Sequence, residues 1–151
     1  MISKRVSLRS FLNHAYIKEM NNYHFYYSGV RNIQNPLVRD LLIEISEAEA
    51  GLVDRIEQIL NTDMVEIANL SFSRDYFASP PNPTPFDPRR AEKEFHIGVC
   101  NDALAMEWES YKFYSSLSDK TNHEELKYFF KQCASLKGEM ITRIRGLFET
   151  F

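Results

Sequence analysis

The sequence predicts an all-α protein, a four-helix bundle made of two similar helical hairpins that a long proline-rich crossover joins. The first observation behind this prediction is an internal repeat, in which residues 13–28 match residues 101–116 at a constant offset. The second is the helical spacing of apolar residues in four long stretches of the chain. The third is the segment 79–88, which holds five of the six prolines and separates the hairpins. A repeated hairpin with one long connection gives four helices of bundle length.

The repeat has an offset of 88 residues and needs no gap. It continues through the second helix of each hairpin, where Ile56 falls on Ile144. One helical hairpin is therefore expected twice. Identical residues occupy matched positions in the first helix of each hairpin: Asn13 and Asn101, Ala15 and Ala103, Glu19 and Glu107, Phe25 and Phe113, Tyr26 and Tyr114, Ser28 and Ser116.

Hairpin one is expected to span about residues 7–60. Ser7 is a suitable N-cap for a first helix that runs to about Asn32. Its inward stripe has helical spacing and comprises Leu8, Phe11, Leu12, Ala15, Glu19, Tyr23, Tyr26 and Val30. Asn35 and Pro36, a cap followed by proline, predict a second, antiparallel helix that runs to about Leu60. The stripe of this helix comprises Val38, Leu41, Leu42, Ile45, Glu49, Leu52, Ile56 and Ile59.

Hairpin two is expected over about residues 88–149, after a crossover of about residues 61–87. Residues 61–70 either extend the second helix or form a short helix, and the prolines that follow favour an extended chain. Asp87 and Pro88 predict the start of a third helix that runs to about Ser118, and a fourth helix follows the turn at 119–121. Residues 1–151 then form a single domain. The alternative is a dimer that exchanges hairpins through the proline segment.

Composition limits the classes of partner. The 151 residues carry a net charge of −3 with lysine and arginine scattered along the chain, so we expect no nucleic-acid partner. No stretch approaches the roughly 20 apolar residues that span a bilayer. The first residues do not resemble a secretion signal, so we expect a cytoplasmic protein without a membrane partner. Cys100 and Cys133 lie in apolar helical patterns and are expected to be free buried thiols.

A charged residue interrupts the apolar stripe of each predicted helix, namely Glu19, Glu49, Glu107 and Lys137. The repeat offset relates Glu49 to Lys137 and Glu19 to Glu107, so we expect all four at similar depth in the bundle. Three buried carboxylates and one ammonium leave two uncompensated negative charges, which a cation, protons or water must relieve. The interior is therefore the candidate functional site.

This pattern resembles the rubrerythrin branch of the ferritin-like di-iron proteins over almost all of the chain outside the crossover. In that family the first and third helices each carry a glutamate followed six and seven residues later by Phe-Tyr, as Glu19 and Glu107 are here. The second and fourth helices each carry Glu-x-x-His, and Glu49 matches the first of these glutamates. The resemblance implies a ferritin-like fold, a metal site, iron-dependent oxidoreductase or peroxidase activity and association into a homodimer.

The chain departs from the family at the remaining ligand positions. Leu52 stands where the histidine of the second helix is expected, and Lys137 and Met140 replace the glutamate and histidine of the fourth. Leucine and an ammonium group cannot bind iron, and a thioether suits a carboxylate-rich site poorly. Glu19 and its two partner glutamates therefore form a vestigial or altered metal site.

Three interpretations of this site follow. In the first, Lys137 replaces the metal charge in a buried ion-pair cluster, and a protein without a cofactor acts at its surface on an unidentified protein partner. In the second, Glu19, Glu49 and Glu107 still hold one iron, manganese or zinc ion. In the third, substitute ligands support a working di-iron oxidase or peroxidase that acts on oxygen or peroxide. The charge balance favours the first interpretation.

The predicted interior is rich in tyrosine, with Tyr16, Tyr23, Tyr26, Tyr27, Tyr111 and Tyr114. Their rings suit core packing and their hydroxyls suit buried carboxylates, whereas beside a redox metal they would quench radicals. The four histidines lie off the carboxylate face, too far along the helix axis, or in a polar first turn. We expect surface or packing roles, rather than metal ligation, for His14, His24, His96 and His123.

Overall fold

Helices make up the regular structure of the computed structural model, which describes residues 4–61 and 80–149. The elements are α1 (Lys4–Gly29), the 3₁₀ turn η1 (Val30–Asn32), α2 (Pro36–Asn61), α3 (Pro88–Lys93), α4 (Phe95–Lys120) and α5 (Glu124–Glu149). No strand occurs in these two ranges, and the all-α prediction is confirmed. Within the same ranges, no helix combines the length and the apolar character needed to cross a membrane.

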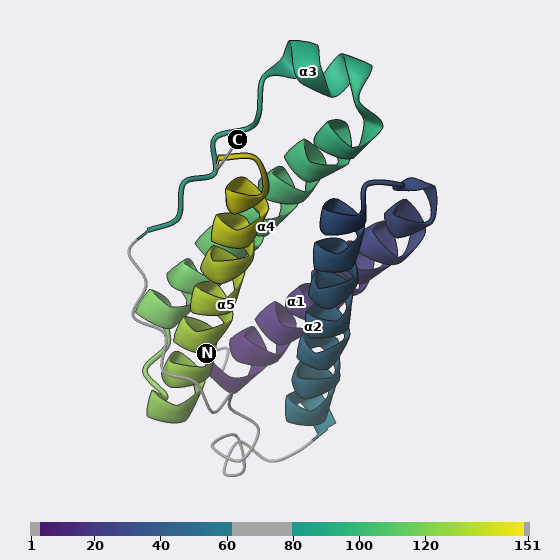
Figure 1. The fold of residues 1–151 in the computed structure, drawn as a ribbon. Helices are drawn as coiled ribbons and strands as arrows, with labels where there is room; N and C mark the ends of the chain where they lie inside the picture. The colour runs from purple at the N-terminus through teal and green to yellow at the C-terminus, as the bar shows by residue number, and fades with distance from the viewer. Residues whose placement is uncertain (1–3, 62–79, 150–151) are drawn as a thin grey trace.

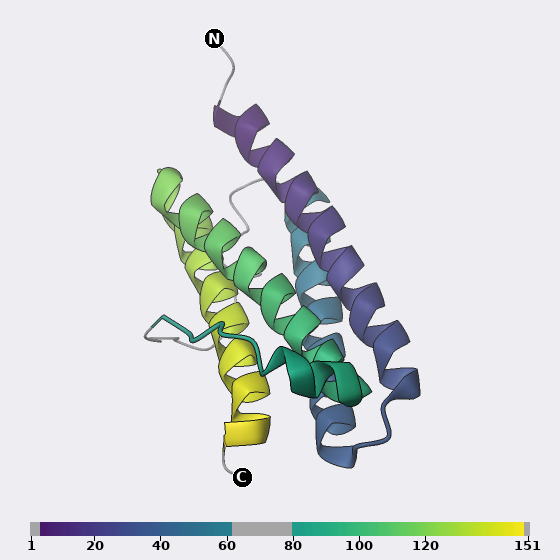
Figure 2. The ribbon, with the colours of Figure 1, turned by 90° about the horizontal axis from the view of Figure 1, so that it is seen from above.

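The four long helices form two antiparallel pairs that lie side by side (Figures 1 and 2), α1 with α2 and α4 with α5. The short helix α3 packs against α4 at one end of the molecule (Figure 1). The facing sides of the two pairs enclose the interior. Both the core and the candidate site therefore lie between the pairs.

The start of α2 follows the predicted capping chemistry, but the start of α1 does not. Asn35 Oδ1 accepts a hydrogen bond from the backbone N–H of Val38 at 3.2 Å, with Pro36 as the first helical residue. The predicted cap Ser7 lies inside α1, which already begins at Lys4. Lysine and arginine are good helix formers, so the residues before Ser7 continue the helix instead of ending it.

The predicted third helix is divided into two helices. It begins as predicted, with Asp87 as its cap, but ends after α3 because Glu94 has an extended backbone with φ −123° and ψ 110°. The carbonyl oxygen of Glu94 accepts hydrogen bonds from the backbone N–H groups of Ile97 and Gly98, which starts α4. The bend packs α3 onto α4 while Ile97 enters the core fully buried.

Residues 80–87 form the described end of the crossover and run beside α5 as an extended segment (Figure 1). Pro81 lies over Gly138, since a Cβ atom on this glycine would be 3.7 Å from Pro81 Cγ. Thr84 O accepts a hydrogen bond from Arg145 Nη1 at 2.6 Å. An extended proline-rich chain rises about 3.1 Å per residue and an α-helix about 1.5 Å, so the two contacts are in register along α5. The predictions for residues 62–79 of the crossover lie outside the described residues.

The core consists of two apolar clusters with a charged layer between them. The cluster nearer η1 includes Tyr26, Ile33, Leu42, Ile45, Ile97, Leu104, Met140 and Ile144. The cluster at the other end includes Leu12, Leu52, Ile56, Tyr114, Leu126, Phe129, Phe130 and Cys133. On each long helix the predicted charged residue falls between residues of one cluster and residues of the other.

Two aromatic residues of α1 that were expected inside lie at the surface. Phe11 is 40% exposed and Tyr27 is 51% exposed, whereas their neighbours Leu12 and Tyr26 are buried. Successive residues of an α-helix are about 100° apart, so only one of each adjacent pair can face the core. The side chain of Leu8 lies outside the described residues. The remaining α1 stripe is buried or partly buried.

Asn101 fastens the end of the crossover to α4, and its loss should weaken the fold. Its amide accepts a hydrogen bond from Phe86 N at 2.7 Å and donates one to Phe86 O at 3.1 Å. We expect Asn101→Ala to lower the free energy of unfolding by about 1–2 kcal/mol, measured by urea denaturation. The matched control is Asn13→Ala at the repeat-equivalent, exposed position, and equal losses in both variants would contradict this role.

Candidate functional site

The structure brings the four predicted charged residues together at the centre of the bundle. Glu19 comes from α1, Glu49 from α2, Glu107 from α4 and Lys137 from α5, and each side chain is 0% exposed. Each residue lies near the middle of its helix, where helical periodicity turns it toward the interior together with its apolar neighbours. We call these four residues the charged cluster.

The ammonium group of Lys137 is the common partner within the charged cluster. Its Nζ lies 2.6 Å from Glu19 Oε2 and 3.2 Å from Glu107 Oε2. It also donates a short hydrogen bond to Glu49 Oε1. The 3.2 Å contact with Glu107 is an ion pair only, because its geometry does not meet the requirements of a hydrogen bond. One cation therefore bridges carboxylates from the three other long helices.

Two buried tyrosines donate further hydrogen bonds to the carboxylates. Tyr26 OH donates to Glu107 Oε1 at 2.9 Å, and Tyr114 OH donates to Glu19 Oε1 at 3.1 Å. Burial and the nearby carboxylates raise the pKa of Tyr26 and that of Tyr114 well above the usual value. Both phenols thus remain protonated donors, and each links α1 to α4.

The electrostatics of the charged cluster put a proton on Glu49. Burial, and then repulsion from Glu107 and Glu19, raise the pKa of Glu49 well above its usual range. Burial also raises the pKa of Glu19, but the Lys137 ammonium and hydrogen bonds from Glu49, Lys137 and Tyr114 bring it below the usual value. Burial lowers the pKa of Lys137, yet attraction by the three carboxylates holds it well above normal. Lys137 is therefore charged and Glu19 ionised at neutral pH, whereas Glu49 is the carboxyl group of these two that holds a proton more tightly.

Two carboxyl oxygens of the charged cluster receive no hydrogen bond from any donor in the described part of the chain. These atoms are Glu49 Oε2 and Glu107 Oε2, and both are buried. An unmatched buried acceptor costs about 1–3 kcal/mol. The proton on Glu49 removes part of this cost, since a protonated carboxyl group can donate to Glu19.

The residues at the positions where the rubrerythrin resemblance implies further ligands do not fit a di-iron centre. Leu52 and Met140 each lie one helical turn from a cluster residue and are buried in the apolar clusters. Neither side chain offers the imidazole nitrogen that such a centre uses. The Lys137 ammonium also stands between the three carboxylates, in the position that a metal ion would need. Iron would have to displace this cation from its ion pairs.

The histidines take positions outside the charged cluster. His14 and His24 are exposed, and His96 and His123 are partly buried. His14 packs against Phe113 with ring centroids 5.5 Å apart, and His123 Nδ1 accepts a hydrogen bond from the backbone of Leu126 at the start of α5. None of the four appears among the groups that surround Lys137.

The cysteines are free and buried, as predicted. Burial raises the pKa of Cys100 to about 12, and burial together with Glu19 raises the pKa of Cys133 well above normal. A raised pKa keeps each thiol protonated at neutral pH, and the thiolate is the nucleophilic form. Neither thiol is therefore suited to nucleophilic catalysis.

Sequence reasoning did not anticipate a buried polar contact next to the charged cluster. Asn22 Nδ2 donates to Ser110 Oγ at 3.3 Å, across α1 and α4. The two residues are 88 positions apart, which is the repeat offset. This relation is the signal that could have revealed the pair, because a residue and its repeat equivalent meet at an axis of two-fold symmetry.

Removal of the Lys137 charge should be strongly destabilising. In Lys137→Met the carboxylates lose their buried counter-ion, so we expect a loss of about 3–5 kcal/mol in the free energy of unfolding at neutral pH. The measurement is urea denaturation, with Lys131→Met at an exposed position of α5 as the control. An unchanged unfolding midpoint for Lys137→Met would disprove the buried ion-pair cluster.

A pair of isosteric variants distinguishes the two carboxyl groups that share a proton. Glu49→Gln imitates the protonated acid, so its melting temperature at pH 7 should remain close to that of the wild type. Glu19→Gln removes an ionised partner of Lys137 and should cost about 2–3 kcal/mol. Thermal unfolding of both variants gives the comparison, and the reverse order of stabilities would contradict the proton on Glu49.

The same pair has opposite effects on the pH profile of stability. The Glu49 contribution is fully present below the ordinary pKa of 4.5 and is lost as pH rises through the raised folded-state value. The Glu19 contribution is present above 4.5 and is lost as pH falls through the lowered value. We expect Glu49→Gln to reduce the loss of stability as pH rises above 4.5, and Glu19→Gln to reduce the loss of stability as pH falls below 4.5. Urea denaturation of both variants across this pH range measures these changes.

Comparison with known proteins gives no match, because no family model, curated protein or solved structure is similar to the chain. The function is therefore inferred from the contacts of the charged cluster and from the motifs of the sequence itself.

Proposed function

We propose that this chain is a rubrerythrin-like member of the ferritin-like proteins in which a lysine ammonium has replaced the metal, and that it works as a binding module rather than as an oxidase. The observation that carries the proposal is the set of contacts from Lys137 Nζ to Glu19, Glu49 and Glu107. A single cation at the meeting point of three helices takes over the charge balance that metal ions provide in the di-iron proteins.

The contacts between the hairpins support the proposed fold and its repeat. Two buried pairs, Asn22 with Ser110 and Glu49 with Lys137, join positions that are 88 residues apart. The two tyrosine contacts exchange partners under the same offset, since Tyr26 donates to Glu107 and Tyr114 donates to Glu19. These relations are those of a pseudo-two-fold axis that runs through the charged cluster.

The chemistry of the donor set opposes metal binding at this position. A divalent ion would compete with an ammonium group whose pKa is raised and would repel it once bound. It would gain three carboxyl groups, one of them protonated, and no imidazole. A lysine in the charged cluster thus favours a metal-free interior. We further propose a homodimer, which the family resemblance suggests, together with a cytoplasmic location and an unidentified protein partner.

One observation favours a second candidate function. Two buried carboxyl oxygens, Glu49 Oε2 and Glu107 Oε2, receive no hydrogen bond from the described residues. These are hard oxygen ligands of the kind that iron, manganese and zinc accept. One ion at this position would require Lys137 to move aside and Glu49 to lose its proton. In that case an oxidoreductase or peroxidase activity of the rubrerythrin type becomes the alternative.

Metal content tests the proposal directly. The wild-type protein, incubated with Fe²⁺ without oxygen and desalted, should hold no stoichiometric iron, manganese or zinc by elemental analysis. The triple variant Lys137→Glu, Leu52→His and Met140→His restores the family ligand set and should hold about two iron ions per chain. About one ion in the wild type would favour the second candidate. A folded triple variant that binds no iron would show that the proposed alignment of the helices is wrong.

A further inference from the structure

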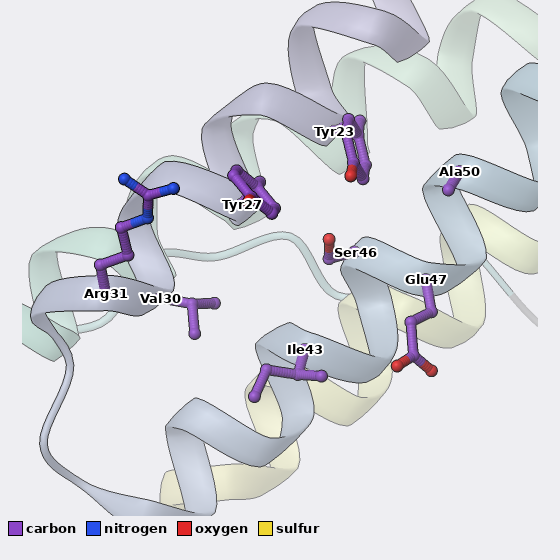
Figure 3. Close-up of a pocket in the computed structure, with 8 residues that line it drawn as sticks. All are labelled: Tyr23, Tyr27, Val30, Arg31, Ile43, Ser46, Glu47 and Ala50. Atoms are coloured by element: carbon purple, nitrogen blue, oxygen red, sulfur yellow. The ribbon is translucent and has the colours of Figure 1, made fainter.

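A hollow on the outer side of the α1–α2 pair is separate from the charged cluster. It has a volume of about 400 Å³ and is lined by Tyr23, Tyr27, Val30, Arg31, Ile43, Ser46, Glu47 and Ala50. Figure 3 shows the two tyrosine rings reaching down from α1 and the Ser46 hydroxyl rising toward them from α2. The hollow thus has aromatic side chains on one wall and small or aliphatic side chains on the other.

The two tyrosines form an aromatic wall along the hollow. The rings of Tyr23 and Tyr27 stack with centroids 5.8 Å apart and planes 29° apart. Tyr27 is 51% exposed, and Ile43 on the facing helix is 37% exposed. Neither tyrosine hydroxyl hydrogen-bonds to a group of the described chain, so both are available as donors. Exposed stacked tyrosines with free hydroxyls are typical of surfaces that bind extended peptides.

The chain already contains an example of the segment that fits such a surface. On the α4–α5 pair, the extended proline segment places Pro81 over Gly138, where a Cβ atom would also lie 3.6 Å from Tyr111. The repeat offset relates Tyr111 to Tyr23 and Gly138 to Ala50. Gly138 is buried beneath the proline, whereas Ala50 is exposed in the hollow. The small residue next to this tyrosine is therefore covered by proline on one pair and exposed on the other.

The charges at the rim indicate which residues should flank the prolines. Arg31 lies over the Tyr27 ring, with its guanidinium 5.0 Å from the centroid, so this end of the hollow is positively charged. Glu47 lies at the opposite end of the hollow in Figure 3 and has no ion-pair partner in the described residues. Further exposed acids on α2 are Asp40, Asp54 and Glu57. The end of the hollow at Glu47 is therefore negatively charged, which complements a cationic segment.

We propose that the hollow binds a proline-rich, basic segment of a partner protein in the polyproline II conformation. This conformation has no internal hydrogen bonds, so its carbonyl groups can accept from the Tyr23 and Tyr27 hydroxyls while its rings pack on the aromatic faces. Glu47 pairs with an arginine or lysine beyond the prolines, and Arg31 keeps that cationic end away from its own side. The proposal does not depend on the metal content of the interior.

A fluorescent oligoproline peptide that ends in two arginines tests this binding site by anisotropy titration of the full chain. The wild type should bind it saturably, and Tyr27→Ala should weaken binding about tenfold or more. Tyr128→Ala, another half-exposed tyrosine, should have no effect. Glu47→Lys should weaken binding, whereas Glu57→Lys makes the same charge change on the same helix and should weaken it far less. Circular dichroism establishes that each variant is folded.

Other outcomes would overturn the proposal. Absence of saturable binding, or binding that Tyr27→Ala leaves unchanged, means that the hollow is not the site. Binding that is lost only when Tyr111 is changed to alanine would locate the peptide on the α4–α5 pair instead. A concentration-dependent dimer that Tyr27→Ala dissociates would assign the hollow to contact between two copies of the chain.

Discussion

The ion pairs of Lys137 with three buried carboxyl groups are the constraint on which the interior depends. Each long helix contributes one residue to this contact, so the rotation and axial position of all four helices are coupled at one point. Apolar side chains can exchange neighbours at modest cost, whereas an unpaired buried charge costs several kcal/mol. The apolar clusters on either side supply most of the driving force, and the charged layer makes one alignment of the hairpins much better than its alternatives.

The proposed pseudo-two-fold axis makes the charge of the side chain at position 137 decisive for the interior. On this axis Glu49 faces its own repeat equivalent, so a glutamate at position 137 would place two carboxyl groups in contact and give the interior four in all. Such an arrangement requires metal ions or several protons. With lysine at this position the four side chains carry one positive charge against three carboxyl groups, and a single proton on Glu49 then relieves half of the remaining negative excess.

Much of this arrangement could be predicted from the sequence because periodicity and the repeat are local, countable signals. The four charged residues, the cap at Asn35 and the buried thiols followed from spacing alone. The break at Glu94 did not, since no proline or glycine marks it and tertiary packing of α3 decides it. The sequence pattern also does not decide which of Tyr26 and Tyr27 faces the core, because that depends on the neighbouring helices. The raised pKa of Glu49 likewise depends on side chains from other helices.

The two halves of the chain differ most on their outer sides, although their inner faces are alike. The segment 80–87 covers Gly138 of the α4–α5 pair, and Asn101 holds its backbone, whereas the equivalent Ala50 and Asn13 of the α1–α2 pair are exposed. Repeats that pack together keep equivalent inner residues because each must fit the other. Their outer faces carry no such requirement, so differences there are free to serve recognition. An interior closed by Lys137 and an open aromatic hollow on the α1–α2 pair are the two features that support the proposed role as a binding module.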